Sequence, residues 1–226
     1  FVTDMLVLEF AIDDRVIDVR RNDNPWLNRA AQSLAEALRL SASKKLDVEF
    51  TELVTGYRLR TGIGTSYIDI YLYDNLSSGA GYAVSVANVI AELLDDMKEL
   101  LSKCDCDSAC SNCLKPYRNQ YVHGILDRFA TLPLLRWGVE GVKADPIESD
   151  DQSKMIRPLI GILKQSGCNI TTTGEITVIS RRSGEKKIVI YPAMWVEPQS
   201  PNTIYVSDAY IKYAKPYAVQ KILDGT

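Results

Sequence analysis

Four of the five cysteines in this 226-residue chain fall within ten residues, and this cluster constrains the fold more than any other feature. Cys104, Cys106, Cys110 and Cys113 have the spacing C-x-C-x3-C-x2-C. Four soft thiolates so close together suit a tetrahedral zinc site, and four protein ligands leave no open position for water. We therefore expect a structural zinc ion. An iron–sulfur cluster and disulfides stay open as alternatives, although the spacing matches neither common ferredoxin pattern.

The rest of the composition excludes several classes of site. The chain has one histidine, His123, so a metal site or catalytic triad that needs several histidines is excluded. His123 could replace a cysteine as a ligand, but four thiols already complete the shell. The net charge of −3 argues against a broad basic surface that coats nucleic acid, yet it permits a local basic patch. Cys168, away from the cluster, is expected to be a small buried side chain in a strand.

Targeting signals are not evident in the sequence. The longest apolar stretch, 82–94, is interrupted by polar residues and is shorter than a membrane span. The N-terminal segment has acidic residues and no secretory cleavage pattern. We therefore expect a cytoplasmic protein without membrane contact, where disulfides are disfavoured.

Hydrophobic periodicity predicts a mixed α+β fold for the first 142 residues. An Asn-Pro pair at Asn24-Pro25 indicates a helix start. Gly62 and Gly64 indicate a hairpin loop, and Pro133 is expected to kink or end the last helix. The expected elements are a strand at 5–10, a helix at 25–42, alternating strands at 46–60 and 67–73, one long helix at 80–103 and a helix at 119–137.

A polar, acidic segment at 142–151 predicts a domain boundary, so we expect domains at 1–142 and 143–226. The second is expected to be a smaller α+β unit of unknown role. Its expected elements are a helix at 152–165, strands at 169–173, 176–180, 187–192 and 203–207, and a final helix at 208–223. The predicted class is thus α+β, with helices packed on a short antiparallel sheet, a four-cysteine knuckle and a C-terminal α+β unit.

Residues 1–140 resemble a known family. The strand and turn IDIYLYDNLSSGAGYA, the helix after it, the cysteine cluster and the segment NQYVHGILDR are similar to the MrfA-type zinc-binding (MZB) domain of superfamily-2 DEAD/DEAH-box helicases. Asp74, Gly79, Gly81 and the four cysteines fill the family's positions, whereas Ser78 replaces the first glycine of the usual pair.

The resemblance implies a noncatalytic C-terminal region of an ATP-dependent DNA helicase that acts in DNA repair or phage defence. That region would brace the motor or guide DNA. The chain has no Gly-Lys dipeptide of a phosphate loop and no DEAD or DEAH sequence, so the expected motor and its ATP site lie upstream of Phe1. The alternative is a protein-interaction module that contacts other subunits and no nucleic acid, which the acidic net charge favours.

Several side chains are candidates for contact with single-stranded DNA. Basic residues after the cysteines alternate with Tyr117 and Tyr121, and cations with aromatic faces suit this ligand. A glycine turn before the helix at 80–103 could bind a phosphate, although Asp74 beside it is expected to be a turn or cap residue. The alternative for the basic residues is that they are solvated surface charges. The alternative for the glycine turn is that it packs a strand against a helix. The candidates are Lys115, Arg118, Arg128, Gly79, Gly81, Arg181 and Arg182.

Overall fold

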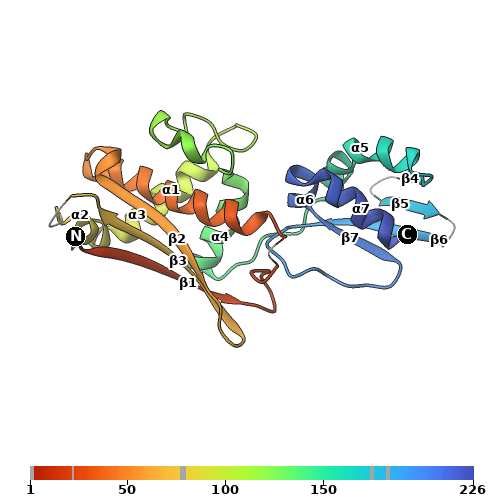
Figure 1. The fold of residues 1–226 in the computed structure, drawn as a ribbon, viewed down its shortest axis with the longest axis horizontal. Helices are drawn as coiled ribbons and strands as arrows, with labels where there is room; N and C mark the ends of the chain where they lie inside the picture. The colour runs from red at the N-terminus through yellow and green to blue at the C-terminus, as the bar shows by residue number, and fades with distance from the viewer. Residues whose placement is uncertain (1–2, 22, 77–79, 174–175, 182–183) are drawn as a thin grey trace. The chain divides into compact units, whose positions relative to one another are not determined.

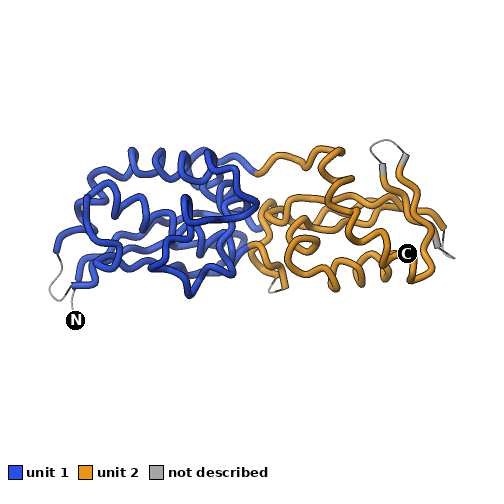
Figure 2. Tube along the Cα trace, turned by 90° about the horizontal axis from the view of Figure 1, so that it is seen from above, with its two compact units in different colours: residues 1–14, 27–143 blue, residues 15–26, 144–226 orange. Residues whose placement is uncertain are grey.

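The computed structural model describes residues 3–21, 23–76, 80–173, 176–181 and 184–226, and it divides the chain into two compact units. Unit 1 comprises residues 1–14 and 27–143, and unit 2 comprises residues 15–26 and 144–226 (Figure 2). Unit 2 is therefore built from two separate pieces of the chain. The sequence predicts domains at 1–142 and 143–226, and their independent folding remains a prediction.

Unit 1 contains a three-stranded antiparallel sheet in the order β1-β3-β2 (Figure 1). Alternation along β3 buries Ile68, Ile70 and Leu72 completely on one face, while Tyr67, Tyr71 and Tyr73 lie on the other face, half-buried. Gly64, with φ of +81°, lies in the hairpin loop between β2 and β3, as predicted. The strands are β1 (Met5–Asp13), β2 (Leu53–Arg60) and β3 (Thr65–Asp74).

Helix α1 (Trp26–Leu46) is the central helix of unit 1. It begins after Asn24, whose side-chain oxygen accepts a hydrogen bond from the Trp26 N–H at 3.1 Å. Its buried residues include Ala30, Leu34 and Leu38, each completely buried. The other helices of unit 1 are α2 (Tyr82–Asn88), α3 (Ile90–Ser102) and α4 (Arg128–Glu140), with 3-10 turns η1 (Phe50–Glu52) and η2 (Tyr117–Val122).

Three sequence-based predictions in unit 1 are wrong in detail. Residues 46–49 are not a strand, because α1 continues to Leu46 and Asp47 adopts a positive φ of 53°. The expected long helix is interrupted at Val89 (φ −117°), next to Asn88, and both are weak helix formers. The apolar face expected for this helix included Val84, Ala87 and Met97. Met97 is buried as predicted, but Val84 and Ala87 are exposed and Val86 is buried instead.

The predicted helix at 119–137 is instead η2, a turn and α4. Helix α4 begins where the Asp127 carboxylate accepts the N–H of Phe129 at 2.9 Å. Pro133 lies inside α4, which continues to Glu140, so Pro133 does not end the helix early. At its C-terminal end, Gly138 lies so close to the Phe10 ring that a Cβ would be 1.8 Å from it, which brings α4 against β1.

Unit 2 is a mixed four-stranded sheet with three helices. The sheet order is β4-β5-β6-β7, antiparallel except for the parallel β6–β7 pair. Its core includes Leu159, Leu163, Ile190 and Val206, and Cys168 is buried there as predicted. The elements are α5 (Ser149–Gln165), β4 (Asn169–Thr173), β5 (Ile176–Arg181), β6 (Gly184–Tyr191), β7 (Thr203–Ser207), α6 (Asp208–Tyr213) and α7 (Lys215–Gly225).

The final helix of unit 2 is split at Ala214, where one helix was expected. Pro216 explains the split, because proline has no N–H to donate to the carbonyl four residues earlier and its ring would clash with that carbonyl, whereas proline is tolerated in the first turn of a new helix. The predicted α+β class is nevertheless confirmed. Within the described residues, none of the helices is both long and apolar enough to cross a membrane.

Candidate metal centre

The four clustered cysteines converge between the end of α3 and the start of η2. Their Sγ atoms all lie within 4.8 Å of one another. Individual separations are 3.5 Å for Cys104–Cys110, 3.7 Å for Cys106–Cys113 and 3.9 Å for Cys110–Cys113. A tetrahedron with metal–sulfur bonds of about 2.3 Å has edges of about 3.8 Å. The sulfur positions therefore fit one tetrahedral ion of that size, which makes the cluster a candidate metal site.

A tight backbone turn places the second cysteine pair. The N–H of Cys113 and the N–H of Lys115 both donate to the carbonyl of Cys110, at 3.1 and 2.9 Å. The N–H of Cys110 in turn points at the Cys113 sulfur over 3.2 Å. N–H donors aimed at sulfur stabilise the thiolate form that metals bind.

Neighbouring groups shift the thiol pKa values in opposite directions. Burial raises the pKa of Cys113 to about 12, whereas the backbone N–H of Asn112 lowers the pKa of Cys110 to about 7. The N–H of Cys106 lowers the pKa of Cys104, but the neighbouring thiols outweigh it and the net shift is upward. Because metals bind thiolates, metal uptake by this cluster must release protons and depend on pH.

Two polar side chains hold the loops on either side of the cluster. Arg128 donates to the carbonyls of Leu101 and Cys106, on the side of Cys104 and Cys106. On the other side, the Asn119 amide donates to the carbonyl of Leu114 at 2.9 Å and to the buried Glu36 carboxylate at 2.8 Å.

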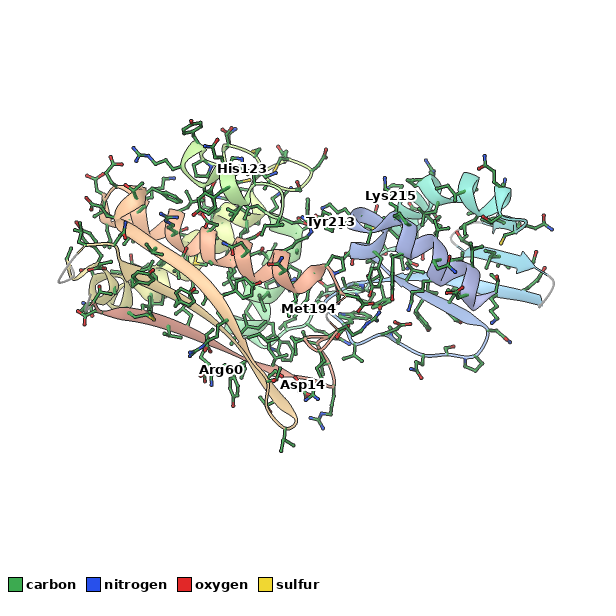
Figure 3. The ribbon with its side chains drawn as sticks, in the orientation of Figure 1. Asp14, Arg60, His123, Met194, Tyr213 and Lys215 are labelled. Atoms are coloured by element: carbon green, nitrogen blue, oxygen red, sulfur yellow. The ribbon has the colours of Figure 1, made fainter. Side chains whose placement is uncertain are left out.

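His123 contacts the residues that hold the cysteine loop and is not one of the four clustered metal-ligand candidates. Its Nε2 is 2.8 Å from the Asn119 Oδ1 and 3.0 Å from the Pro116 carbonyl (Figure 3). A single Nε2–H can donate to both oxygens. In the part of the chain that is described, the metal-capable group of His, Cys, Asp and Glu residues consists of the four cysteines alone.

The glycine turn before α2 is occupied by a side chain of the protein itself. The completely buried Asp74 accepts hydrogen bonds from the N–H groups of Ala80 (2.6 Å), Tyr82 (3.0 Å) and Ala83 (3.0 Å). Three N–H groups at this helix start are thus already paired with a carboxylate of the protein, and Asp74 is the cap residue that the sequence favoured. Gly81, with φ of +77°, permits the turn, whereas Gly79 lies outside the described residues.

The other nucleic-acid candidates are in different environments. Tyr117 and Tyr121 of η2 are 80% and 71% exposed, and the exposed Arg118 lies beside them with Glu49 at 3.2 Å. Lys115 is half-buried. Arg128 is buried, with its donors on main-chain carbonyls. Arg181 ends β5, but its side chain and all of Arg182 lie outside the described residues.

Sequence reasoning missed the supporting roles of Arg128, Asn119 and Glu36. A signal was present for Glu36, because a carboxylate interrupts the apolar face of α1 and a buried charge requires a partner. For Asn119, its spacing of four residues from His123 was the only local indication. Nothing in the sequence pairs Arg128 with carbonyls more than twenty residues earlier, since that contact depends on tertiary folding.

Comparison with known proteins identifies a domain in the segment that carries the cysteines. A family model described as the MrfA Zn-binding domain (MZB) matches residues 28–114, which include Asp74 and all four cysteines. The chain contains an MZB domain. It is also 32% identical over 216 residues to the Druantia protein DruE of Escherichia coli (strain UMEA 4076-1), a match that covers 92% of this chain and 12% of DruE.

The MZB match confirms the family resemblance, although over a shorter range than the expected 1–140. A solved structure of the DUF1998 helicase MrfA bound to DNA is 19% identical to this chain, with a TM-score of 0.40, and the match covers 52% of this chain and 15% of that one. The chain thus spans about an eighth of the length of DruE. Similarity to DruE extends beyond the MZB domain into unit 2.

Proposed function

We propose that this chain is a noncatalytic, zinc-stabilised accessory region of an ATP-dependent DNA helicase. The observation that carries the proposal is the convergence of four cysteine sulfurs, all within 4.8 Å of one another, in the segment that matches the MZB domain. The zinc ion would be held by Cys104, Cys106, Cys110 and Cys113 and would supply a cross-link rather than a reactive centre, because four thiolates leave no open position.

The cysteine loop is suited to a bracing role. It connects the C-terminal end of α3 to η2 and, through Arg128, to the start of α4. An ion pair between Lys98 of α3 and Glu140 of α4 joins these helices at a second point. A cross-link at this position makes α3, η2 and α4 one rigid unit that can pack against a motor. We place that motor, with its ATP site, elsewhere in a longer polypeptide, and the protein in the reducing cytoplasm.

The nucleic-acid ligand that best fits unit 1 is single-stranded DNA at η2. Tyr117 and Tyr121 present exposed rings on which bases can stack, and Arg118 and Lys115 offer positive charge beside them. The Tyr121 hydroxyl is 3.4 Å from the guanidinium of Arg39, a contact that orients the Tyr121 ring. Arg39 itself is buried and lies over the Phe50 ring. The buried Arg128 is not part of this proposed contact, and repair or phage defence is the setting that the family resemblance implies.

Fluorescence anisotropy with labelled single-stranded DNA tests this contact. We expect binding that weakens as salt rises, with a slope of about −0.7 in log affinity per phosphate contact. Arg118→Ala and Tyr121→Ala should each weaken it several-fold, whereas Arg157→Ala, at an exposed position of α5, should not. Absence of binding at low salt would contradict the DNA contact.

The second candidate is a protein-interaction module without nucleic-acid contact. The specific observation in its favour is the outer face of the unit 1 sheet, where Met5 and Val7 are 54% and 43% exposed beside Tyr71 and Tyr73. Methionine and tyrosine are enriched in protein interfaces. Lack of DNA binding together with capture of helicase motor domains would favour this function.

A further inference from the structure

Arg128 is a buried arginine whose guanidinium lies against the loop that carries Cys104 and Cys106. Only 8% of the residue is exposed. Its Nε and Nη2 donate to the carbonyl of Cys106 at 3.2 and 3.0 Å, and its Nη1 donates to the carbonyl of Leu101 at 3.1 Å. Its main-chain N–H also donates to the Ser108 carbonyl at 2.9 Å. One residue therefore fixes three points of the segment 101–108.

The position of this cation requires an electrostatic explanation. Burying a charge among neutral groups is costly unless an opposite charge lies nearby. The carbonyls are neutral, and the Phe129 ring, 4.0 Å from the guanidinium carbon, offers a cation–π contact of modest strength. Four thiolates around one divalent cation carry a net charge of −2. With the ion bound, that charge would lie near Arg128, because Cys106 contributes both a thiol of the cluster and the carbonyl that Arg128 binds.

We propose that Arg128 is a positioning residue of the metal centre. It fixes the Cys106 peptide so that two cysteines separated by one residue can face the same ion, and it places a permanent positive charge beside the thiolates. The proposal rests on the zinc centre proposed above. Residues that bind and orient metal ligands typically change metal affinity by about 10–100-fold when they are replaced, so Arg128 should slow the loss of metal from the site.

Three variants of the full chain separate this role from general stabilisation of α4. Arg128→Met removes the charge and the donors, and Arg128→Lys keeps the charge but cannot bind one carbonyl through two nitrogens. Arg136→Met is the matched control, because Arg136 is on the same helix, half-buried and paired with Glu140 at 3.7 Å. The quantity to be measured is the rate at which each zinc-loaded variant releases zinc to a chromogenic chelator.

We expect release at least about tenfold faster for Arg128→Met, an intermediate rate for Arg128→Lys and a rate within about twofold of wild type for Arg136→Met. In cobalt-loaded protein, the thiolate-to-cobalt absorption band should shift in Arg128→Met and not in Arg136→Met. A loss of packing in α4 would not move that band selectively.

The rate from Arg128→Lys decides the proposal even if Arg128→Met fails to fold. Release at the wild-type rate from Arg128→Lys would overturn the positioning role, and so would equal rates for Arg128→Met and wild type. A wild-type chain that binds no metal would overturn both proposals, whereas normal metal content with unchanged release rates would overturn this one alone.

Discussion

The Nδ2 of Asn119 donates to the Oε2 of Glu36 over 2.8 Å, with both side chains buried. This bond joins the segment after the cysteines to the middle of α1. Asn119→Ala would leave the buried carboxylate with the weaker contact from Gln32 at 3.5 Å. We expect a loss of about 1–3 kcal/mol in the free energy of unfolding, measured by urea denaturation.

A second substitution tests whether the charge of Glu36 causes this loss. In the Asn119→Ala background, Glu36→Gln replaces a buried carboxylate by a neutral amide, which is less costly to leave unpaired. The double variant should therefore be more stable than the sum of the two single effects. Strict additivity would show that the Asn119–Glu36 bond does not carry the effect.

Asp74 should be essential for the start of α2. Asp74→Ala leaves three N–H groups at the helix start without their acceptor, and the expected loss is about 1–3 kcal/mol. Asp74→Asn, which keeps an acceptor oxygen, should lose less. Hydrogen exchange at Tyr82 and Ala83 is the readout, and unchanged protection in Asp74→Ala would contradict the assigned role.

Stability in acid should depend on Asp69. Hydrogen bonds from Arg60 and then Arg58 lower the pKa of this carboxyl, and Arg60 contacts both of its oxygens. A lowered folded-state pKa adds stability above the unfolded aspartate pKa of about 3.9, and that stability is lost as the pH falls below it. Asp69→Asn should thus lower stability at pH 7 and flatten the decline below pH 4. The exposed Asp95→Asn should keep the wild-type profile.

Unit 2 should depend on the segment 15–26. Asp23 accepts hydrogen bonds from the hydroxyls of Tyr210 (3.0 Å) and Tyr217 (2.7 Å), and the Asn24 amide donates to the Ala193 carbonyl (2.8 Å). Asn24→Ala should destabilise unit 2 by about 1–2 kcal/mol and should also weaken the start of α1, because Asn24 accepts the Trp26 N–H there. Faster hydrogen exchange in β6 and β7 is expected, with α3 unaffected. Equal exchange in β6 and β7 of the variant and wild type would mean that the segment is not an integral part of unit 2.

Sequence patterns predicted those parts of the fold that local chemistry determines. The alternation of Ile68, Ile70 and Leu72 with tyrosines identified β3, and Asn24 identified the start of α1. The cysteine spacing alone identified the four candidate metal ligands. In each case, the signal is confined to neighbouring residues.

Features that depend on distant contacts were not predictable in the same way. The interruption at Val89 was missed because apolar residues continue through it. Hydrogen bonds from Arg128 to Leu101 and from Asn119 to Glu36 connect residues far apart in the sequence. The same holds for the segment 15–26, which joins unit 2 although it lies between β1 and α1 of unit 1.

Loss of one cysteine of the cluster should remove the metal. Cys110→Ser should lower zinc content to near zero and increase hydrogen exchange in η2 and at the start of α4, because those segments are held by the cysteine loop. Cys168→Ala is the matched control, since Cys168 is buried in unit 2, and it should keep full metal content. Retention of metal in Cys110→Ser would exclude Cys110 as a ligand.

The most direct test of the account is the metal content of the purified wild-type chain, determined by elemental analysis without added metal. We predict about one zinc ion per chain and no stoichiometric iron, as expected for a closed four-cysteine site. A chain that is folded and carries no zinc, or that carries an iron–sulfur cluster instead, would contradict the central claim.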